Sequence, residues 1–84
     1  MDYAACCKVC VTFEIVGGPG SGTFSVTLEG SLEDVWDIEY DYDEGIPSWS
    51  FYITRDGVRV HGPVVVTEFL DTYTITSISN GKCL

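Results

Sequence analysis

The sequence predicts an all-β fold, a small sandwich of about seven antiparallel strands, with a small β-barrel as the alternative. Apolar and polar residues alternate nearly everywhere with the period of two that is typical of strands. Turn signals interrupt this alternation roughly every 10–14 residues, a spacing that suits both architectures. No amphipathic helix of useful length can be read from the sequence. We expect residues 1–7 to form an N-terminal arm and residues 8–84 to form a single domain.

The first half of the chain predicts three strands. In residues 8–16 one face carries the apolar side chains Val9, Val11, Phe13 and Ile15. The glycine-rich residues 17–22 predict a flexible connection to a second strand at 23–29, whose inward positions are Phe24, Val26 and Leu28. Residues 35–45 alternate again, with inward positions at Trp36, Ile38, Tyr40 and Tyr42. The opposite face of this third strand carries carboxylates.

Residues 49–61 predict a hairpin with a two-residue turn. Asp56-Gly57 is a favoured pair for a type I′ turn. That turn sets Arg55 opposite Val58, Ile53 opposite Val60, and Phe51 opposite Gly62. We therefore expect one face to bury Phe51, Ile53, Val58 and Val60. The other face would gather Tyr52, Thr54, Arg59 and His61, and among these we take Tyr52, Arg59 and His61 as candidate interaction residues.

Two more strands are expected at 63–69 and 70–79. Asn80-Gly81 is again a hairpin turn, but only three residues follow it. A final strand this short would leave an edge that a partner can occupy.

The charge balance excludes several classes of partner. Asp and Glu number 13 against 4 Lys and Arg, for a net charge of −9. Such a protein repels phosphate backbones and anionic lipid, so we expect neither nucleic-acid nor membrane binding. Its apolar runs are too short for a membrane helix, and its N-terminus does not resemble a secretory signal. The acidity suits solubility, cation binding or a basic partner.

A row of carboxylates is the first candidate site. On a strand the side chains at alternate positions share a face, about 7 Å apart, so the outward row collects Asp37, Glu39, Asp41 and Asp43. Three interpretations remain open: a solvated acidic face, a docking site for a basic partner, or a weak Ca²⁺ site. The spacing is not that of an EF-hand loop, because the later ligands are missing.

Four cysteines, Cys6, Cys7, Cys10 and Cys83, form the second candidate site. The first and last strands of a sandwich commonly run side by side, so we expect a disulfide from Cys83 to Cys7 or Cys10. Reduced, buried cysteines are one alternative. A zinc site is another, although structural zinc usually takes two separate cysteine pairs.

The sequence contains no complete catalytic or cofactor-binding motif. Gly17 and Gly22 have the spacing of a phosphate loop, but Thr23 stands where the motif needs lysine and a strand follows where a helix should start. His61 is the only histidine, and no nucleophile elbow accompanies it. We expect no enzyme activity and no cofactor.

Residues 47–81 resemble an immunoglobulin-like sandwich module of the kind found on bacterial surfaces. "WSFYITRDGVRV" is similar to the tryptophan-bearing strand and hairpin of such domains, and "DTYTITSISNG" to their tyrosine corner. The resemblance implies that Tyr73 sits at the corner, with its hydroxyl bonded to upstream backbone. The cysteine pair of antibody domains is absent.

The functional expectation is a structural role. A small domain of surface type, with no catalytic constellation and no evident export signal, suits a protein that is made in the host cytoplasm and assembled into a virus or phage particle. Capsid decoration, head-fibre, neck or tail accessory proteins fit, with other structural proteins and copies of the chain as partners. The alternative is an extracellular or cell-surface module of a bacterium, adhesin-like or inhibitor-like, or a strand-donating filament subunit.

Overall fold

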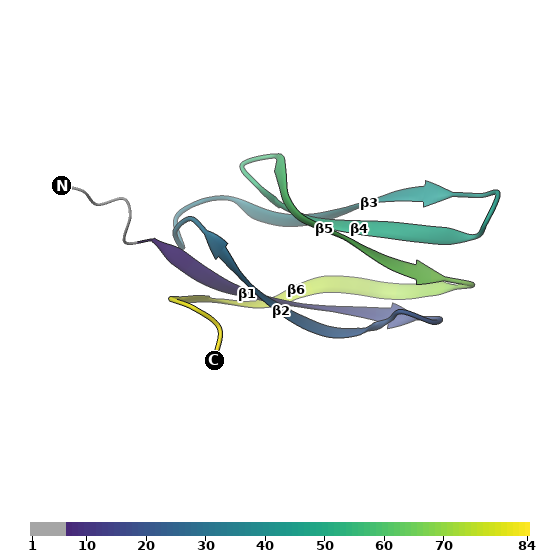
Figure 1. Cartoon of the computed structure of the whole chain (residues 1–84), viewed down its shortest axis with the longest axis horizontal. Helices are drawn as coiled ribbons and strands as arrows, with labels where there is room; N and C mark the ends of the chain where they lie inside the picture. The colour runs from purple at the N-terminus through teal and green to yellow at the C-terminus, as the bar shows by residue number, and fades with distance from the viewer. Residues whose placement is uncertain (1–6) are drawn as a thin grey trace.

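A computed structural model describes residues 7–84, which form six strands and no helix. The strands are β1 (Lys8–Gly17), β2 (Gly22–Glu29), β3 (Trp36–Asp43), β4 (Ser48–Arg55), β5 (Val58–Thr67) and β6 (Leu70–Asn80). Two three-stranded antiparallel sheets, ordered β2-β1-β6 and β3-β4-β5, lie one over the other (Figure 1). The all-β prediction is therefore confirmed. Within residues 7–84 there is no helix of the length and apolarity that would cross a membrane.

The strand count within the described residues is six rather than seven. Residues 58–61 and 63–69 were expected as separate strands, but β5 runs unbroken from Val58 to Thr67. The chain passes through Gly62-Pro63, a cis peptide bond, without leaving the sheet.

The core lies between β1 and the facing strands β4 and β5. The four side chains predicted to face inward from β1, Val9, Val11, Phe13 and Ile15, are at most 1% exposed, which confirms the face predicted for residues 8–16. Phe51, Ile53 and Val66 meet them from the other sheet and are equally buried. β1 is the central strand of its sheet, so neighbours cover it on both sides. Burying a side chain of this size contributes roughly 1.5–3 kcal/mol, so this short row is the main source of stability.

The hairpin of β4 and β5 follows the predicted register only beside its turn. Arg55 faces Val58 as expected, but Ile53 faces His61 instead of Val60, and Phe51 faces Val64 instead of Gly62. An extra residue after Arg59 turns His61 to the face that carries Ile53, and a second extra residue before Val64 restores the original alternation, so Val64 and Val66 again face the core. The prediction that Phe51 and Ile53 are buried is confirmed. The prediction that Val58 and Val60 are buried is wrong, because they are 64% and 37% exposed.

Substitution of Val58 tests this register. We expect Val58→Thr to change the free energy of unfolding by about 0.5 kcal/mol or less, because the side chain is in solvent. The matched control, Val66→Thr, places a hydroxyl in the core and should cost roughly 1–3 kcal/mol. Urea unfolding measures both. Equal losses would mean that the regular alternation holds in β5 after all.

The glycine-rich connection between β1 and β2 closes one end of the sandwich. It was expected to be a loose loop, but its backbone packs directly on the end of β5. The Gly18 amide donates to the Phe69 carbonyl at 2.8 Å, and the Thr67 amide donates to the Pro19 carbonyl at 3.0 Å. A Cβ added at Gly20 would lie 2.1 Å from the Val65 carbonyl oxygen. Glycine is needed there because two backbone segments touch.

Candidate interaction surface

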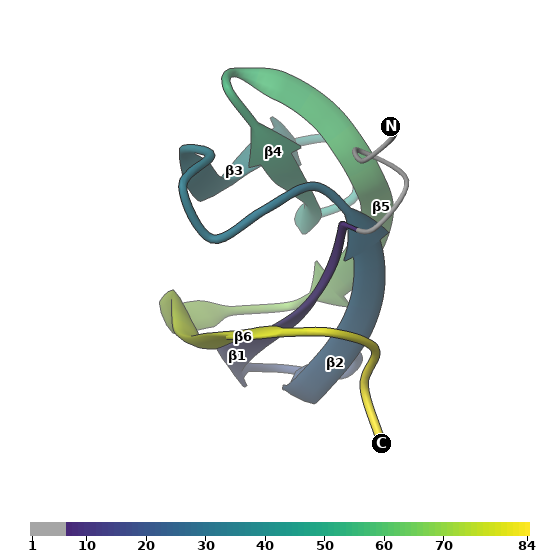
Figure 2. The ribbon, with the colours of Figure 1, turned by 90° about the vertical axis from the view of Figure 1, so that its left-hand side faces the viewer.

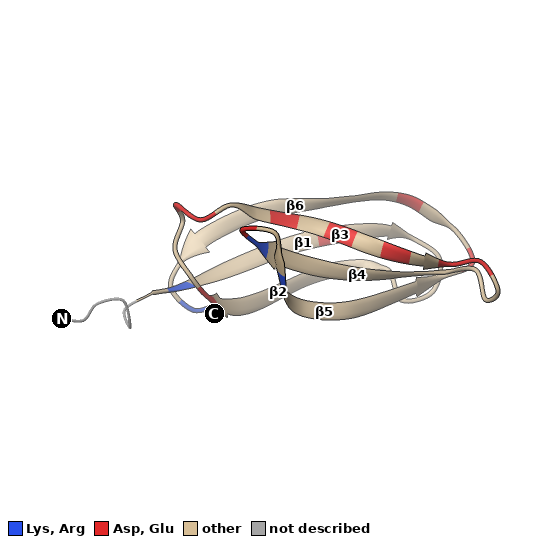
Figure 3. Cartoon of the chain, turned by 90° about the horizontal axis from the view of Figure 1, so that it is seen from above, with Lys and Arg blue, Asp and Glu red and all other residues tan. Residues whose placement is uncertain are grey.

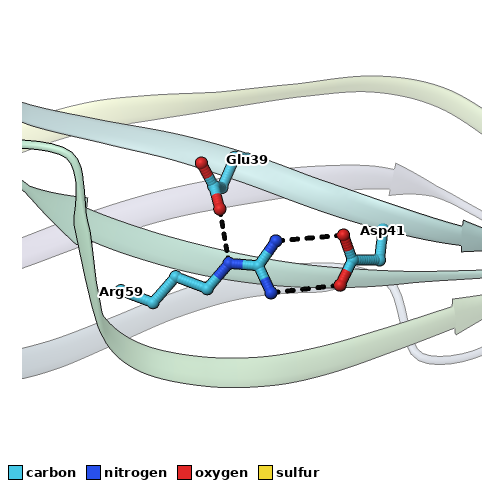
Figure 4. A network of polar contacts seen from close by, with 3 residues as sticks. All are labelled: Glu39, Asp41 and Arg59. Atoms are coloured by element: carbon cyan, nitrogen blue, oxygen red, sulfur yellow. Dashed lines mark hydrogen bonds and ion pairs between the residues drawn. The ribbon is translucent and has the colours of Figure 1, made fainter.

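Arg59 joins two of the four carboxylates on β3 (Figure 4). Its Nη1 and Nη2 each donate to Asp41 at 3.0 Å, and its Nε donates to Glu39. The guanidinium lies over the ring of Tyr52, with Cζ 3.9 Å from the ring centroid. Tyr52 is on β4, between the strands that carry the cation and the carboxylates, so its ring supports the arginine as it crosses. A planar, five-donor group on an aromatic face is the arrangement that favours arginine over lysine.

The contact shifts the protonation of both partners. Hydrogen bonds from Arg59 hold the pKa of Asp41 below its ordinary value of 3.8, and the same bonds raise the pKa of Arg59. An aspartate whose pKa is lower in the folded than in the unfolded state stabilises the fold when the pH is above the ordinary aspartate pKa. This stabilisation is lost as the pH falls through the pKa of the folded state. Both side chains are substantially exposed, at 40% for Arg59 and 61% for Asp41, so salt screens the contact.

Removal of the guanidinium should leave a row of repelling carboxylates. We expect Arg59→Gln to lower the melting temperature most at neutral pH and low salt, and the difference from wild type to vanish well below pH 3.8. Arg55→Gln is the matched control, because Arg55 donates to the backbone carbonyl of Glu29. Thermal unfolding over pH and salt checks the prediction. A decrease in the melting temperature of Arg59→Gln that does not depend on pH or salt would show that packing, and not charge, is the cause.

The other two carboxylates of the row contact their own backbone. Asp37 accepts the Ile38 amide at 2.8 Å, and Asp43 accepts the Gly45 amide at 2.9 Å. Figure 3 shows acidic residues along β3 and at both ends of the sandwich, while the basic residues lie toward the end that holds the chain termini. Within residues 7–84 no three His, Cys, Asp or Glu side chains are grouped closely enough to hold a metal. The Ca²⁺ interpretation therefore gains no support from the geometry.

The side of the sandwich between β3 and β6 exposes aromatic rings. Viewed along the molecule, these two edge strands lie on the same side (Figure 2). Tyr40 of β3 meets Tyr73 of β6 at a ring-centroid distance of 5.5 Å, and both rings contact Phe51. Tyr42 packs on Trp49 at 5.0 Å. We call Tyr40, Tyr42 and Tyr73 the tyrosine side; they are 41%, 49% and 36% exposed.

The tyrosine side was not identified from the sequence. Alternation correctly placed Tyr40 and Tyr42 on the inward face, but a strand at the edge of a sheet leaves its inward face half open. The immunoglobulin-like resemblance implied a corner position for Tyr73, whereas its ring packs across the open side. The sequence signal that could have indicated this surface is the pair of tyrosines at alternate positions of an acidic strand, Tyr40 and Tyr42.

The three candidate interaction residues of the hairpin do not lie on one face of the sheet. Tyr52 and Arg59 share the outer face and touch. His61 lies on the inner face, opposite Ile53, with its ring 6.4 Å from that of Phe13. The extra residue in β5 turns His61 inward, so the prediction that it joins Tyr52 and Arg59 is wrong.

The structure joins Cys10 to Cys83, one of the two pairings that the sequence left open. The link crosses the outer face of β1, where the Cys83 amide also donates to Oγ1 of Thr27. Residues 81–84 form no strand and instead run over β1 toward β2. None of the described cysteines is free. Cys6, the remaining candidate, lies outside the described residues, as does the expected arm apart from Cys7.

Two shallow clefts, of about 570 and 490 Å³, open at the end of the sandwich near Cys7. Both are lined by Lys8, Glu29 and Arg55. The lining charges balance in the larger cleft, where Asp34 joins Glu29, and are only partly balanced in the smaller one, while Arg55 donates to the Glu29 carbonyl. Such a surface selects no class of ligand.

Comparison with known proteins found no matching family model, no matching curated protein and no matching solved structure.

Proposed function

We propose that this chain is a non-enzymatic structural module that works through protein–protein contacts as a component of a virus or phage particle. The roles that suit it are those of capsid decoration, head-fibre, neck or tail accessory proteins. Its partners are other structural proteins of the assembly. The proposal assigns it no catalysis and no cofactor.

The observation that carries the proposal is the tyrosine side. Two edge strands lie next to each other there, and three tyrosines are left exposed between them. Aromatic residues are enriched at protein interfaces because they combine a large apolar surface with a polar group. Free strand edges are sites at which another chain can pair.

Co-sedimentation tests this proposal. Particles from the source culture are separated on a density gradient, and the chain is quantified by mass spectrometry across the fractions. We expect it to travel with the particle peak and to cross-link to particle proteins through Tyr40, Tyr42 or Tyr73 in a tyrosine-selective photoreaction. Recovery of the chain only in the slow-sedimenting fractions would overturn the proposal.

A second candidate is an extracellular binding module of a bacterium, adhesin-like or inhibitor-like. The Cys10–Cys83 link favours it, because disulfides form and persist outside the reducing cytosol. The same fractionation separates the candidates, since a surface module would be recovered with the cell envelope. A module completed by a donated strand is a variant of this candidate.

Copies of the chain are also proposed to associate. β6 is suited to this contact because Asp71 is its only charged residue, so two copies can approach there with little repulsion. Light scattering over a concentration series measures the association. A mass that stays monomeric at every concentration would count against it.

A further inference from the structure

β3 is a free strand edge with unbroken geometry. It pairs with β4 over eight consecutive residues without a register shift. β5 and β6 each contain two shifts, which bend a strand and disrupt its edge. Within residues 7–84, β4 is the only strand hydrogen-bonded to β3. The opposite edge of β3 is therefore straight enough to accept another strand.

The backbone groups at this edge can be identified. The Ile38 amide donates to the side chain of Asp37, its neighbour in sequence, so it points away from β4. Amide and carbonyl directions alternate along an antiparallel strand, so Tyr40 and Tyr42 also present their backbone groups to the free edge. A strand laid there would find hydrogen-bonding partners at alternate residues of β3.

The side chains beside the edge define the chemistry of its occupant. The inner face offers the half-open rings of Tyr40 and Tyr42. The outer face offers carboxylates, and Arg59 shows that a cationic side chain fits against them. Directly opposed like charges destabilise a strand pair, whereas opposed charges stabilise it. A second copy of β3 is disfavoured for this reason, and a basic strand is favoured.

We propose that an extended segment of a partner protein adds to the free edge of β3 as a further strand of this sheet. Lysine or arginine side chains of the segment would face outward, beside Asp37, Glu39, Asp41 and Asp43. Its alternate, apolar side chains would cover the tyrosine side. The inference rests on the proposed function in that it takes protein contact to be the role of the chain, and it names the chemistry of the partner.

Peptide binding followed by NMR tests the inference on the whole chain. The probe is a capped eight-residue peptide that alternates lysine with valine or threonine. We expect the amide resonances of Ile38, Tyr40 and Tyr42 to shift and their hydrogen exchange to slow. Three control peptides separate the contributions: one with glutamate in place of lysine, one with the same residues in blocks, and one N-methylated at alternate residues. N-methylation should weaken binding by about tenfold or more, because backbone hydrogen bonds supply much of the affinity of an added strand.

Two double variants locate the charges. Asp37→Asn with Asp43→Asn should weaken binding and reduce its salt dependence, while each asparagine can still accept the local backbone amide. Glu14→Gln with Asp71→Asn removes the same charge from the other sheet and should leave affinity unchanged. Shifts at Tyr73 of β6 are expected, because its ring contacts Tyr40. The inference is overturned by shifts that appear at β2 and not at β3, by equal binding of the N-methylated or block peptide, or by absence of binding. Those results leave the co-sedimentation test of the proposed function standing, since a particle contact can use another surface.

Discussion

Replacement of both Cys10 and Cys83 by serine is expected to lower the free energy of unfolding by about 4 kcal/mol, judged by the chain entropy of the loop that they close. The two cysteines are 73 residues apart in sequence, so the cross-link restricts nearly the whole unfolded chain. The total free energy of unfolding of a native domain is roughly 5–15 kcal/mol, so the disulfide supplies a large share of the stability. Urea unfolding of the oxidised wild type and the double variant measures the loss.

Reduction provides an independent check. Dithiothreitol should bring the wild type close to the double variant, and Cys10→Ser alone should cost as much as both substitutions together, because either change breaks the same bond. Differential alkylation before and after reduction reports the state of the thiols. Ready alkylation of Cys10 and Cys83 in the native protein, or unchanged unfolding in the double variant, would contradict the prediction.

Substitution of Gly20 by alanine is expected to destabilise the domain by more than about 3 kcal/mol. Two effects add. Gly20 has a φ of 96°, a conformation that alanine adopts only with strain. A Cβ there would also lie 2.1 Å from the Val65 carbonyl oxygen, so the connection would have to leave β5. Urea unfolding measures the loss, and circular dichroism identifies a variant that no longer folds.

Gly57→Ala is the matched control for the conformational cost alone. Gly57 has a φ of 85°, but no atom lies within 4 Å of its added Cβ. We expect it to lose roughly 1–2 kcal/mol, the usual cost of a left-handed conformation. Equal losses at Gly20 and Gly57 would show that the contact between the glycine connection and β5 contributes nothing.

Much of the fold follows from local pattern. Alternation in residues 8–16 identified this strand and its buried face. The apolar residues of an alternating strand all lie on one face, so only that face can be buried in the core. Asp56-Gly57 identified a turn and the pairing of Arg55 with Val58, because that dipeptide is suited to the left-handed conformations of the turn. Along β5 the same reasoning failed, since neither of its two extra residues has a sequence signal strong enough to reveal it.

The candidate site also has one part that the local sequence pattern predicts and another part that depends on tertiary contacts. The carboxylate row on β3 could be predicted, because alternate residues of a strand share a face. Its partner Arg59 could not, because the contact crosses β4 and depends on how the arginine side chain lies over the ring of Tyr52. The choice of Cys10 over Cys7 as the partner of Cys83 also depends on where the tail crosses β1.

The sequence by itself determined the fold class, the buried face of β1, the turn at residues 56–57 and the strongly acidic outer face of β3. These are properties of neighbouring residues, which backbone periodicity and side-chain chemistry decide locally. Only the tertiary structure decided the pairing of β1 with β6, the inward turn of His61, the exposed tyrosine side and the free, regular edge of β3. Those features depend on which segments distant in sequence contact each other. The free energy that favours one arrangement of the segments comes from many contacts between residues far apart in the chain.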